Sequence, residues 1–505
     1  MSRYAFMLLL LVVCFGAVLT GTAYAEQIAS GYVYVDENGN GQREASEQGL
    51  GGVRVSNGRE VVATDSSGRY ELKVKDDTVI FLIKPRDYMV ALDENNLPKF
   101  YYVHKPSGSP IELEYRGVAP TGALPESVDF GLIRRPEKDE FEVIIFGDPQ
   151  PNNIGDINHL AHDIVEELVG TNAAFGTALG DLMADLLNLY EPYNNVMGRI
   201  GIALFNVPGN HDMNLDVNSD ELANETWKRI LGPATYSFNW GAVHFICVDD
   251  VIYHGEGESY SGGFNEQQLE FIKNDLKYVP KDALVVLMMH IPLDEVDASV
   301  LFSLLKDRDY TLSLAGHNHE IRQLFIGADE GWEGSGLHHH VVAGATCGIH
   351  WLGVKDEYGI PAAMTHCGSP NGYLIVTFNG NQYKIRFKAP RRPADEQMHI
   401  YTPDMIKASD AGETEVVVNV FFGSERSRVQ MKLDDSKQWT LLSRQAREDP
   451  YLQKVVPEGH PLSMVTHLWV GKLPANLSRG GHVIYVRTKD MFGQEYTAHR
   501  VIRVE

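Results

Sequence analysis

Cysteine is scarce in this sequence, with four residues in a chain of 505. Cys14 falls in an apolar N-terminal stretch, and Cys247 lies in an apolar run, where a thiol is most simply buried. Cys347 and Cys367 share one polar loop region, and an oxidising compartment would permit a bridge between them. The sequence leaves open whether their geometry allows that bridge.

Long apolar runs are also missing beyond the N-terminus, since no other stretch approaches the roughly 20 apolar residues that cross a bilayer. The exception, Tyr4–Leu19, follows Arg3 and precedes Ala23-Tyr24-Ala25, a typical cleavage sequence, and so predicts a signal peptide over residues 1–25. A membrane anchor is the alternative, but the run is short and no stop-transfer flank follows. We therefore expect cleavage after Ala25 and an exported protein, periplasmic or extracellular, with no membrane span afterwards.

Basic residues are fewer than acidic ones, with 44 Lys and Arg residues against 68 Asp and Glu residues, which gives a net charge of −24. This balance argues against non-specific binding to nucleic acid or to an anionic membrane surface. It does not exclude a phosphate substrate, because bound metal cations would dominate the local field. The length indicates between about two and four domains.

Residues 26–135 alternate apolar and polar side chains between clusters of Gly, Asn and Asp, a pattern typical of a small antiparallel β-sandwich. The segment Thr64–Tyr70 gives this region a resemblance to the transthyretin-like or prealbumin-like modules of secreted proteins. The expected strands are Ile28–Val35, Val53–Val55, Tyr70–Val74 and Val79–Ile83.

A possible calcium loop begins inside this region at Asp36. Oxygen-bearing residues at loop positions one, three and five, a Gly at six and a Glu at twelve match the spacing of calcium loops. The alternative is a plain Asn-Gly turn. A single ion here would be structural, because the coordinating groups all close around it. The expected ligands are Asp36, Asn38, Asn40, the Gln42 carbonyl and Glu47.

In the central region, residues 137–388, apolar runs repeatedly end in clusters of metal-ligand residues. Short apolar runs bounded by turn residues indicate buried strands, and ligands collect beyond the carboxyl ends of strands in open α/β sheets. Five such ends that offer Asp, Asn or His predict one site assembled from distant parts of the chain. The pairs are Phe141–Phe146 before Asp148-Pro149-Gln150, Phe175–Leu179 before Gly180-Asp181, Ala203–Val207 before Gly209-Asn210-His211-Asp212, Leu284–Met289 before His290, and Thr311–Ala315 before Gly316-His317-Asn318-His319.

Helical patterns alternate with these strands. Apolar residues recur at close to 3.6-residue spacing in Ile157–Val169, Glu266–Leu276 and Asp297–Leu305. Strand and helix alternation implies an α/β layered domain.

The five motifs, in this order, resemble those of the calcineurin-like metallophosphoesterase superfamily. The resemblance implies a central α/β/β/α sandwich and hydrolysis of phosphate mono- or diesters at two divalent cations, which would be Mn, Fe, Zn or Mg. It also implies two overlapping ligand sets, with Asp148, Gln150, Asp181 and His319 on the first ion and Asp181, Asn210, His290 and His317 on the second.

The chemistry fits these residue types. Two ions roughly 3.5–4 Å apart can clamp the attacking and leaving oxygens of a phosphoryl transfer, and a carboxylate such as Asp181 suits the bridging position. By resemblance, a hydroxide between the ions would be the nucleophile. His211 would face the substrate phosphate, to stabilise charge or protonate the leaving oxygen, and Asp212 would orient and charge His211.

Gln150 departs from the family, in which most members have His at this position. Because an amide carbonyl is a harder and neutral donor, the identity and affinity of the first ion are open.

Two subfamilies of these phosphoesterases fit the sequence poorly. Purple acid phosphatases supply a Tyr ligand where this chain has Ala184, and periplasmic 5′-nucleotidases continue with Glu-Phe-Asp where it has Asp212-Met213-Asn214.

The sequence indicates the residues that would determine substrate specificity less clearly than the metal ligands. The segment Cys347–Tyr373 resembles a signature of bacterial exported members, and Trp351 could cover the site as a stacking wall, with packing beneath a loop as the alternative. His338-His339-His340 could bind metal, but adjacent rings do not easily reach one ion, so a structural or substrate-lining role is expected.

Residues 391–505 follow the linker Ala389–Pro393 and again alternate apolar and polar residues, which predicts an immunoglobulin-like β-sandwich. This order of domains resembles bacterial calcineurin-like phosphoesterases with dedicated N- and C-terminal β-domains. The expected strands are Val416–Phe422, Val429–Leu433, Thr466–Val470, His482–Arg487 and Arg500–Val504.

Two functions compete on this sequence. The first is an exported binuclear phosphoesterase that acts on a small phosphorylated substrate or on a phosphodiester-containing glycan or lipid. The second is a catalytically inactive, calcium-stabilised surface binding protein. Because loss of catalysis should remove ligands, and every position of the predicted site still offers one, the enzyme is favoured.

Overall fold

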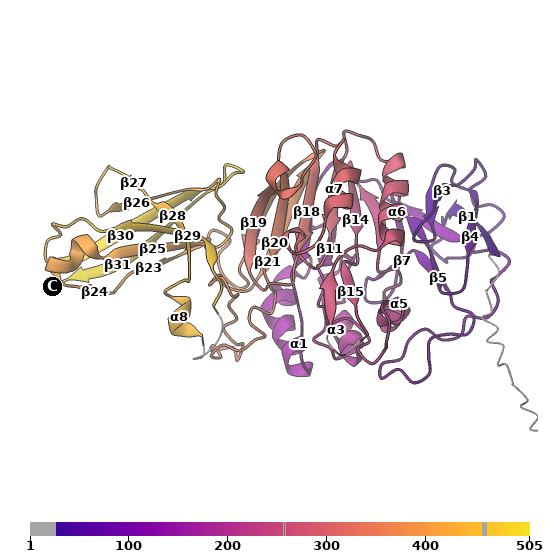
Figure 1. Cartoon of the computed structure of the whole chain (residues 1–505), viewed down its shortest axis with the longest axis horizontal. Helices are drawn as coiled ribbons and strands as arrows, with labels where there is room; N and C mark the ends of the chain where they lie inside the picture. Colours follow the sequence, from indigo (N-terminus) through magenta and orange to yellow (C-terminus); the bar gives the residue numbers. More distant parts are fainter. Residues whose placement is uncertain (1–26, 256, 258, 457–461) are drawn as a thin grey trace, which may run out of the picture.

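The computed structural model describes residues 27–255, 257, 259–456 and 462–505, so the expected signal peptide and Cys14 lie outside the described residues. Three regions follow one another along the longest axis of the molecule (Figure 1). We call them the N-terminal (27–135), central (137–388) and C-terminal (391–505) regions. Within the described part of the chain, no helix is both long and apolar enough to cross a membrane.

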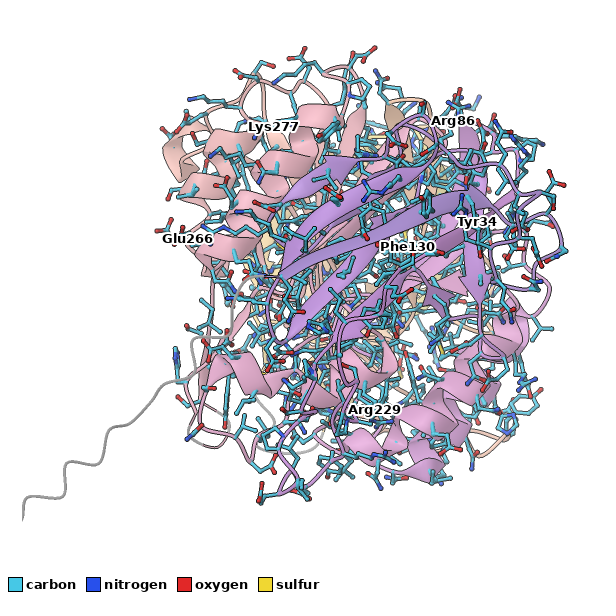
Figure 2. The ribbon with its side chains drawn as sticks, turned by 90° about the vertical axis from the view of Figure 1, so that its right-hand side faces the viewer. Tyr34, Arg86, Phe130, Arg229, Glu266 and Lys277 are labelled. Carbon is cyan, nitrogen blue, oxygen red and sulfur yellow. The ribbon has the colours of Figure 1, made fainter. Side chains whose placement is uncertain are left out.

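The N-terminal region consists of two β-sheets whose buried side chains meet in one hydrophobic cluster. One sheet has the order β4-β1-β9-β6-β7 and the other β3-β2-β5-β8. Figure 2 looks onto this region, with Tyr34 and Phe130 on its strands and Glu266 on the neighbouring helix. The strands are β1 Gln27–Val35, β2 Arg54–Ser56, β3 Val61–Ala63, β4 Arg69–Val74, β5 Thr78–Ile83, β6 Tyr88–Leu92, β7 Pro98–Lys99, β8 Tyr101–His104 and β9 Phe130–Arg134.

The central region mixes helices and strands, as its sequence predicts, and is built on two larger sheets. The five-stranded sheet has the order β12-β11-β10-β21-β22, and the six-stranded sheet has the order β13-β14-β17-β18-β20-β19. The strands are β10 Glu140–Phe146, β11 Phe175–Ala178, β12 Ala203–Leu204, β13 Tyr236–Trp240, β14 Val243–Cys247, β15 Val251–Tyr253, β16 Tyr260–Gly262, β17 Leu284–Met288, β18 Thr311–Ala315, β19 Ile321–Ile326, β20 His338–Ala343, β21 Tyr373–Asn379 and β22 Gln382–Lys388.

Strand β10 buries both of its faces, which explains its continuous apolar run. Val143 and Ile145 join a cluster that also contains Val286 of the six-stranded sheet. Ile144 and Phe146 point the other way, into a second cluster that contains residues of helices α1 and α3. Because successive side chains alternate across a strand, β10 lies between the second sheet and a helical layer.

The helices are short and mostly belong to the central region. The predicted helix over Ile157–Val169 is present but divided, because a π-helical turn at Ala161–Val165 separates α1 from α2. Helix α6 begins at a capping box in which Asn265 and Gln268 satisfy each other's backbone N–H groups. The helices are α1 Ile154–Leu160, α2 Glu166–Leu168, α3 Tyr190–Met197, α4 Asp220–Ala223, α5 Glu225–Ile230, α6 Glu266–Asp275, α7 Ser299–Leu305 and α8 Leu452–Val455.

The C-terminal region again consists of two sheets, and these share their own hydrophobic cluster. Their orders are β23-β25-β29-β28 and β24-β31-β30-β26-β27. All five expected strands occur. Short strands that the sequence does not predict complete each sheet. The strands are β23 Met398–Tyr401, β24 Met405–Ile406, β25 Glu415–Val420, β26 Arg428–Leu433, β27 Thr440–Leu441, β28 Ser443–Arg447, β29 Val465–Lys472, β30 Gly480–Lys489 and β31 Glu495–Val504.

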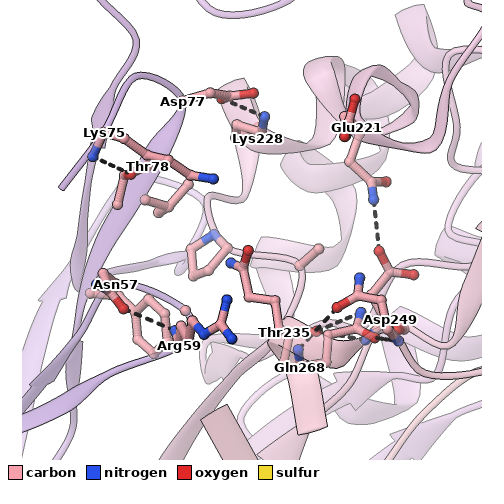
Figure 3. Close-up of a pocket in the computed structure, with 18 of the residues that line it drawn as sticks. Asn57, Arg59, Lys75, Asp77, Thr78, Glu221, Lys228, Thr235, Asp249 and Gln268 are labelled. Atoms are coloured by element: carbon pink, nitrogen blue, oxygen red, sulfur yellow. Dashed lines mark hydrogen bonds and ion pairs between the residues drawn. The ribbon is translucent and has the colours of Figure 1, made fainter. Parts of the chain in front are cut away.

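The N-terminal and central regions are joined by ion pairs, and together they line an open cavity of about 890 Å³ (Figure 3). Lys228 of α5 lies 2.7 Å from Asp77 in the turn before β5, and Lys105 lies 2.9 Å from the buried carboxylate of Glu225. The residues that line this cavity include none of the predicted metal ligands. The cavity is therefore separate from the site that the motifs build.

Candidate metal centre

The structure brings the five predicted motifs together from two different sheets. Asp148, Asp181 and Asn210 follow β10, β11 and β12 of the five-stranded sheet, whereas His290 and His317 follow β17 and β18 of the six-stranded sheet. These strands run parallel within each sheet, so their carboxyl ends meet at one edge. The site therefore lies where both sheets end, and neither sheet could form it alone.

The residues expected on the second ion form a compact group. His290 Nε2 lies 2.9 Å from Asn210 Oδ1, 3.1 Å from His317 Nδ1 and 3.3 Å from Asp181 Oδ1. The ligand atoms of Asp181, His290 and His317 all lie within 4.8 Å of one another. A carboxylate and two imidazoles at this spacing match the donors that zinc, manganese or iron bind.

The residues expected on the first ion lie beside this group. His319 Nε2 is 4.0 Å from Asp148 Oδ1, and Gln150 Nε2 is 3.3 Å from Asp181 Oδ2. This contact leaves Gln150 Oε1 buried without a hydrogen-bond partner among the described residues. A buried carbonyl oxygen without a donor is costly, so a bound cation would satisfy it.

Hydrogen bonds to backbone carbonyls orient the rings of two of the predicted ligands. His290 donates from Nδ1 to Leu179 O at 2.9 Å, and His319 donates from Nδ1 to Gly348 O at 2.8 Å. Each ring therefore presents Nε2 to the site, which is the arrangement that orients a histidine ligand. The backbone N–H of His290 also donates to Asp250 Oδ1, at 3.0 Å. Asp250 was not singled out by the sequence.

Two of the imidazoles favour the neutral state that metal binding requires, whereas burial raises the pKa of Asp148 to about 7 and so disfavours its charged form. Burial lowers the pKa of His317 to about 4 and that of His319 to about 3, which keeps both rings neutral. Burial opposes charge on His290 as well, but Asp181 overcomes it and raises the pKa of His290 to about 10. The negative charge of Asp181 that favours a proton on His290 would equally favour a metal cation bound between the two residues.

Five of the predicted ligands have strained backbone conformations. Asp148, Gln150, Asp181, His317 and His319 have positive φ values of 35°, 40°, 48°, 74° and 51°. Each costs on the order of 1–3 kcal/mol for a residue other than glycine, and such strain clusters at functional sites. Neighbouring glycines make room, since a Cβ on Gly209 would lie 2.2 Å from Asp181 Oδ1.

The partner of His211 differs from the prediction. His211 Nδ1 lies 2.8 Å from Asp185 Oδ1, whereas Asp212 is fully buried and accepts hydrogen bonds from the N–H groups of Leu182, Met183 and Gly209. The expectation that Asp212 orients His211 is therefore wrong. Asp185 takes that position, and the signal that could have found it is a second carboxylate four residues after Asp181.

His211 sits at the edge of the centre. Its backbone N–H donates to Asp181 Oδ1 at 2.9 Å, and its side chain remains 30% exposed, so the ring can face a substrate. Burial opposes the charged imidazole, but the hydrogen bond with Asp185 outweighs it and raises the pKa of His211 to about 9. A protonated His211 is suited to donate a hydrogen bond or a proton to an oxygen.

Trp351 does not form the expected stacking wall. Its side chain is 4% exposed and belongs to the hydrophobic cluster of α1 and α3, with its ring 5.8 Å from that of His159. The alternative interpretation, packing beneath a loop, therefore applies.

The three adjacent histidines of β20 are buried and do not share one ligand position. His338 Nε2 and His340 Nδ1 both lie 2.7 Å from Ser313 Oγ, and His339 Nδ1 lies 2.8 Å from the hydroxyl of Tyr383. Their role is structural, which is one of the two roles expected for them.

The described cysteines are unpaired. Cys347 and Cys367 are both free and buried, so the bridge that the sequence left open is not formed. Cys347 instead lies behind the centre, with its sulfur 4.0 Å from His319 Nδ1.

In the predicted calcium loop, backbone N–H groups of the loop donate hydrogen bonds to the loop's own carboxylates. Asp36 accepts hydrogen bonds from the N–H groups of Gly39 and Gly41, at 2.7 Å and 2.8 Å, and Glu47 accepts one from Glu37. Gly39 and Gly41 both have φ of 71°, which glycine adopts readily. The side chains of positions one and twelve therefore face the same backbone turn.

Comparison with known proteins gives one family match towards each end of the chain. Residues 37–118 match the family described as the N terminal of calcineurin-like phosphoesterase, and residues 340–496 match the family described as its C terminal. No curated relative matches the chain.

Among solved structures, a purple acid phosphatase from yellow lupin (Lupinus luteus) seeds matches with 12% identity and a TM-score of 0.35, over 72% of this chain and 67% of its own. CopC from Methylosinus trichosporium matches 21% of this chain and 94% of its own, with 16% identity and a TM-score of 0.13. A superoxide reductase from Ignicoccus hospitalis matches 22% of this chain and 81% of its own, with 17% identity and a TM-score of 0.13. Both family matches carry the name of the calcineurin-like phosphoesterases, the superfamily that the five motifs between the two matched segments resemble.

Proposed function

We propose that this protein is an exported, binuclear metal-dependent phosphoesterase that hydrolyses a phosphate mono- or diester. The observation that carries the proposal is the convergence of Asp181, His290 and His317, from two sheets, beside the unpartnered oxygen of Gln150. Two bound divalent cations would supply an activated water and neutralise the charge of the phosphate. The apolar N-terminal stretch supports export, and the two pairs of flanking sheets support separate β-sandwich domains at 26–135 and 391–505.

The residues of this protein would bind the ions, donate to the substrate and position a ligand. Asp148, Asp181, Gln150, Asn210 and the three histidines of the motifs would hold the ions. His211, supported by Asp185, would donate to the phosphate or to the leaving oxygen. Asp250 and the carbonyl of Leu179 would keep the ring of His290 in place.

The direct test is a screen of phosphomonoesters against phosphodiesters with Mn²⁺ added. Hydrolysis that disappears on chelation and returns with metal is the expected result. Purified protein that binds metal but hydrolyses none of these esters would favour the inactive binding protein instead.

Gln150 should set the metal preference of the first site. Oxygen donors suit Mn²⁺ and Mg²⁺, whereas imidazole suits Zn²⁺ and iron. We therefore expect activity to rise when Mn²⁺ is added after purification, and Gln150→His to bind Zn²⁺ at least about tenfold more tightly than the wild type, because imidazole suits Zn²⁺ better than an amide oxygen and changes around a metal typically alter its affinity by about 10- to 100-fold. Titration of the metal-free wild type and variant with both ions measures this. Equal affinity and selectivity in the two proteins would reject Gln150 as a ligand.

We also propose that the loop beginning at Asp36 binds one structural Ca²⁺. Calcium sites of extracellular modules have Kd values on the order of 10⁻⁴–10⁻³ M, so about 10 mM Ca²⁺ should stabilise the N-terminal region by about 1.4–2.7 kcal/mol. Thermal unfolding of the full chain with Ca²⁺, and with Mg²⁺ at the same concentration, measures the effect. Asp36→Asn should abolish the Ca²⁺ response, and a response that survives in this variant would place the ion elsewhere.

A further inference from the structure

Two histidines that belong to none of the five motifs lie against the metal centre. The ring of His319 is 4.9 Å from that of His350 and 5.9 Å from that of His366, measured between centroids. Both come from the loop 344–372 between β20 and β21, and both are partly exposed. The ring of His317 in turn lies 4.9 Å from that of His290 and 6.1 Å from that of Tyr260. The loop therefore adds two imidazoles beside His319.

The loop that carries these rings is held in place at several points. Thr346 donates from its N–H to Gly147 O at 2.6 Å, next to Asp148, and His366 donates from its N–H to His319 O at 2.8 Å. From the C-terminal region, Asn419 Nδ2 donates to Cys367 O at 2.9 Å. These bonds couple the loop both to the ligands and to strand β25.

Backbone strain marks the same loop. His350 and Trp351 have φ values of 50° and 57°, in the left-handed region that residues with a Cβ seldom adopt. Strain of this kind persists only where surrounding contacts enforce it, and it clusters at binding and catalytic sites. The burial of Trp351 anchors the turn, while the preceding ring of His350 remains partly exposed beside His319.

His350 and His366 differ from the buried histidines of β20. His338 and His340 are fully buried and lie within 2.7 Å of Ser313, as expected of structural residues. His350 and His366 keep part of their surface accessible, so they can reach a molecule bound at the centre. Imidazole N–H groups donate hydrogen bonds to anionic oxygens. In the proposed function, the ions and His211 already bind the reacting phosphate, so these two rings would be available for another anionic group.

We propose that His350 and His366 form a subsite for a second phosphoryl group, joined to the one that reacts. The substrate class is then a pyrophosphate-linked ester rather than a simple monoester. This inference rests on the proposed phosphoesterase function and adds the substrate class to it. His350 and His366 would bind the non-reacting phosphate and would not be required to hold the ions.

The test compares inorganic pyrophosphate with inorganic phosphate as inhibitors of p-nitrophenyl phosphate hydrolysis, at one fixed concentration of free Mn²⁺. We expect pyrophosphate to bind the wild type at least about tenfold more tightly than phosphate, the effect of one hydrogen bond to a charged group. In His350→Asn/His366→Asn this preference should fall to about twofold, while metal content by elemental analysis and kcat for p-nitrophenyl phosphate stay unchanged. The matched control is His162→Asn, whose exposed ring contacts Glu166 away from the centre and should leave the preference intact.

Each other result overturns the proposal. An unchanged pyrophosphate preference in the double variant would assign the two rings to packing, and a loss of bound metal would make them ligands. If the double variant does not fold, His350→Gln and His366→Gln are measured singly with the same criteria. If the wild type hydrolyses no ester, the phosphoesterase function fails, but calorimetric titration of the metal-loaded protein with pyrophosphate and phosphate still decides whether the subsite exists.

Discussion

Asp181→Asn should lower kcat at least about a hundredfold, or about 2.7 kcal/mol in the barrier, while the fold is kept. Asp181 lies 3.3 Å from His290 and also receives the N–H of His211 and the amide of Gln150, so it joins all parts of the centre. An amide in its place has one oxygen and no charge, and it cannot bridge two cations. Steady-state kinetics with saturating Mn²⁺, together with elemental analysis, measures the effect.

The control for this variant is Asp307→Asn, which makes the same chemical change at an exposed carboxylate paired with Lys281 at 3.8 Å. It should leave kcat and the metal content unchanged. A kcat for Asp181→Asn above about a tenth of the wild-type value would contradict the bridging assignment.

His211→Ala should lower kcat by about 10²-fold or more without loss of metal, because proton transfer by a positioned side chain contributes on that scale. The ring lies outside the Asp181, His290 and His317 group and is partly exposed toward substrate. Asp185→Asn should lower kcat in the same direction but by less, because the imidazole remains and only its partner changes. Elemental analysis that finds an ion missing in His211→Ala would instead make His211 a ligand.

Asp212→Asn separates a role in chemistry from a role in folding. The Asp212 carboxylate accepts three backbone N–H groups and the hydroxyl of Tyr190, and an amide would turn its NH₂ toward some of these donors. We expect a loss of about 1–3 kcal/mol in the free energy of unfolding, with the pairing of His211 and Asp185 intact. Thermal unfolding measures the loss. A variant that keeps its stability but loses turnover as severely as His211→Ala would restore Asp212 as the partner of His211.

The sequence by itself determined where the predicted ligands lie, which is at the ends of apolar runs. An apolar run followed at once by Asp, Asn or His is a local pattern, and β10, β11, β17 and β18 end within a residue of where it predicts. Burial on both faces makes such strands continuous apolar runs, so they can be read without any knowledge of their neighbours. The short strands β6 to β9 carried no comparable pattern, because they are partly exposed and depend on pairing with other strands: β9 with β1, β6 with β9, β7 with β6, and β8 with β5.

Only the tertiary structure decided which side chains meet. Asp212 is adjacent to His211 in the chain, yet backbone N–H groups from another loop draw its carboxylate inward and leave Asp185 to reach the ring. Trp351 and His350 are consecutive, but the left-handed turn buries one and brings the other to His319. The physical reason is the same in each case. Sequence fixes the period and ends of an element through local sterics and burial, whereas the direction of a loop side chain depends on long-range hydrogen bonds.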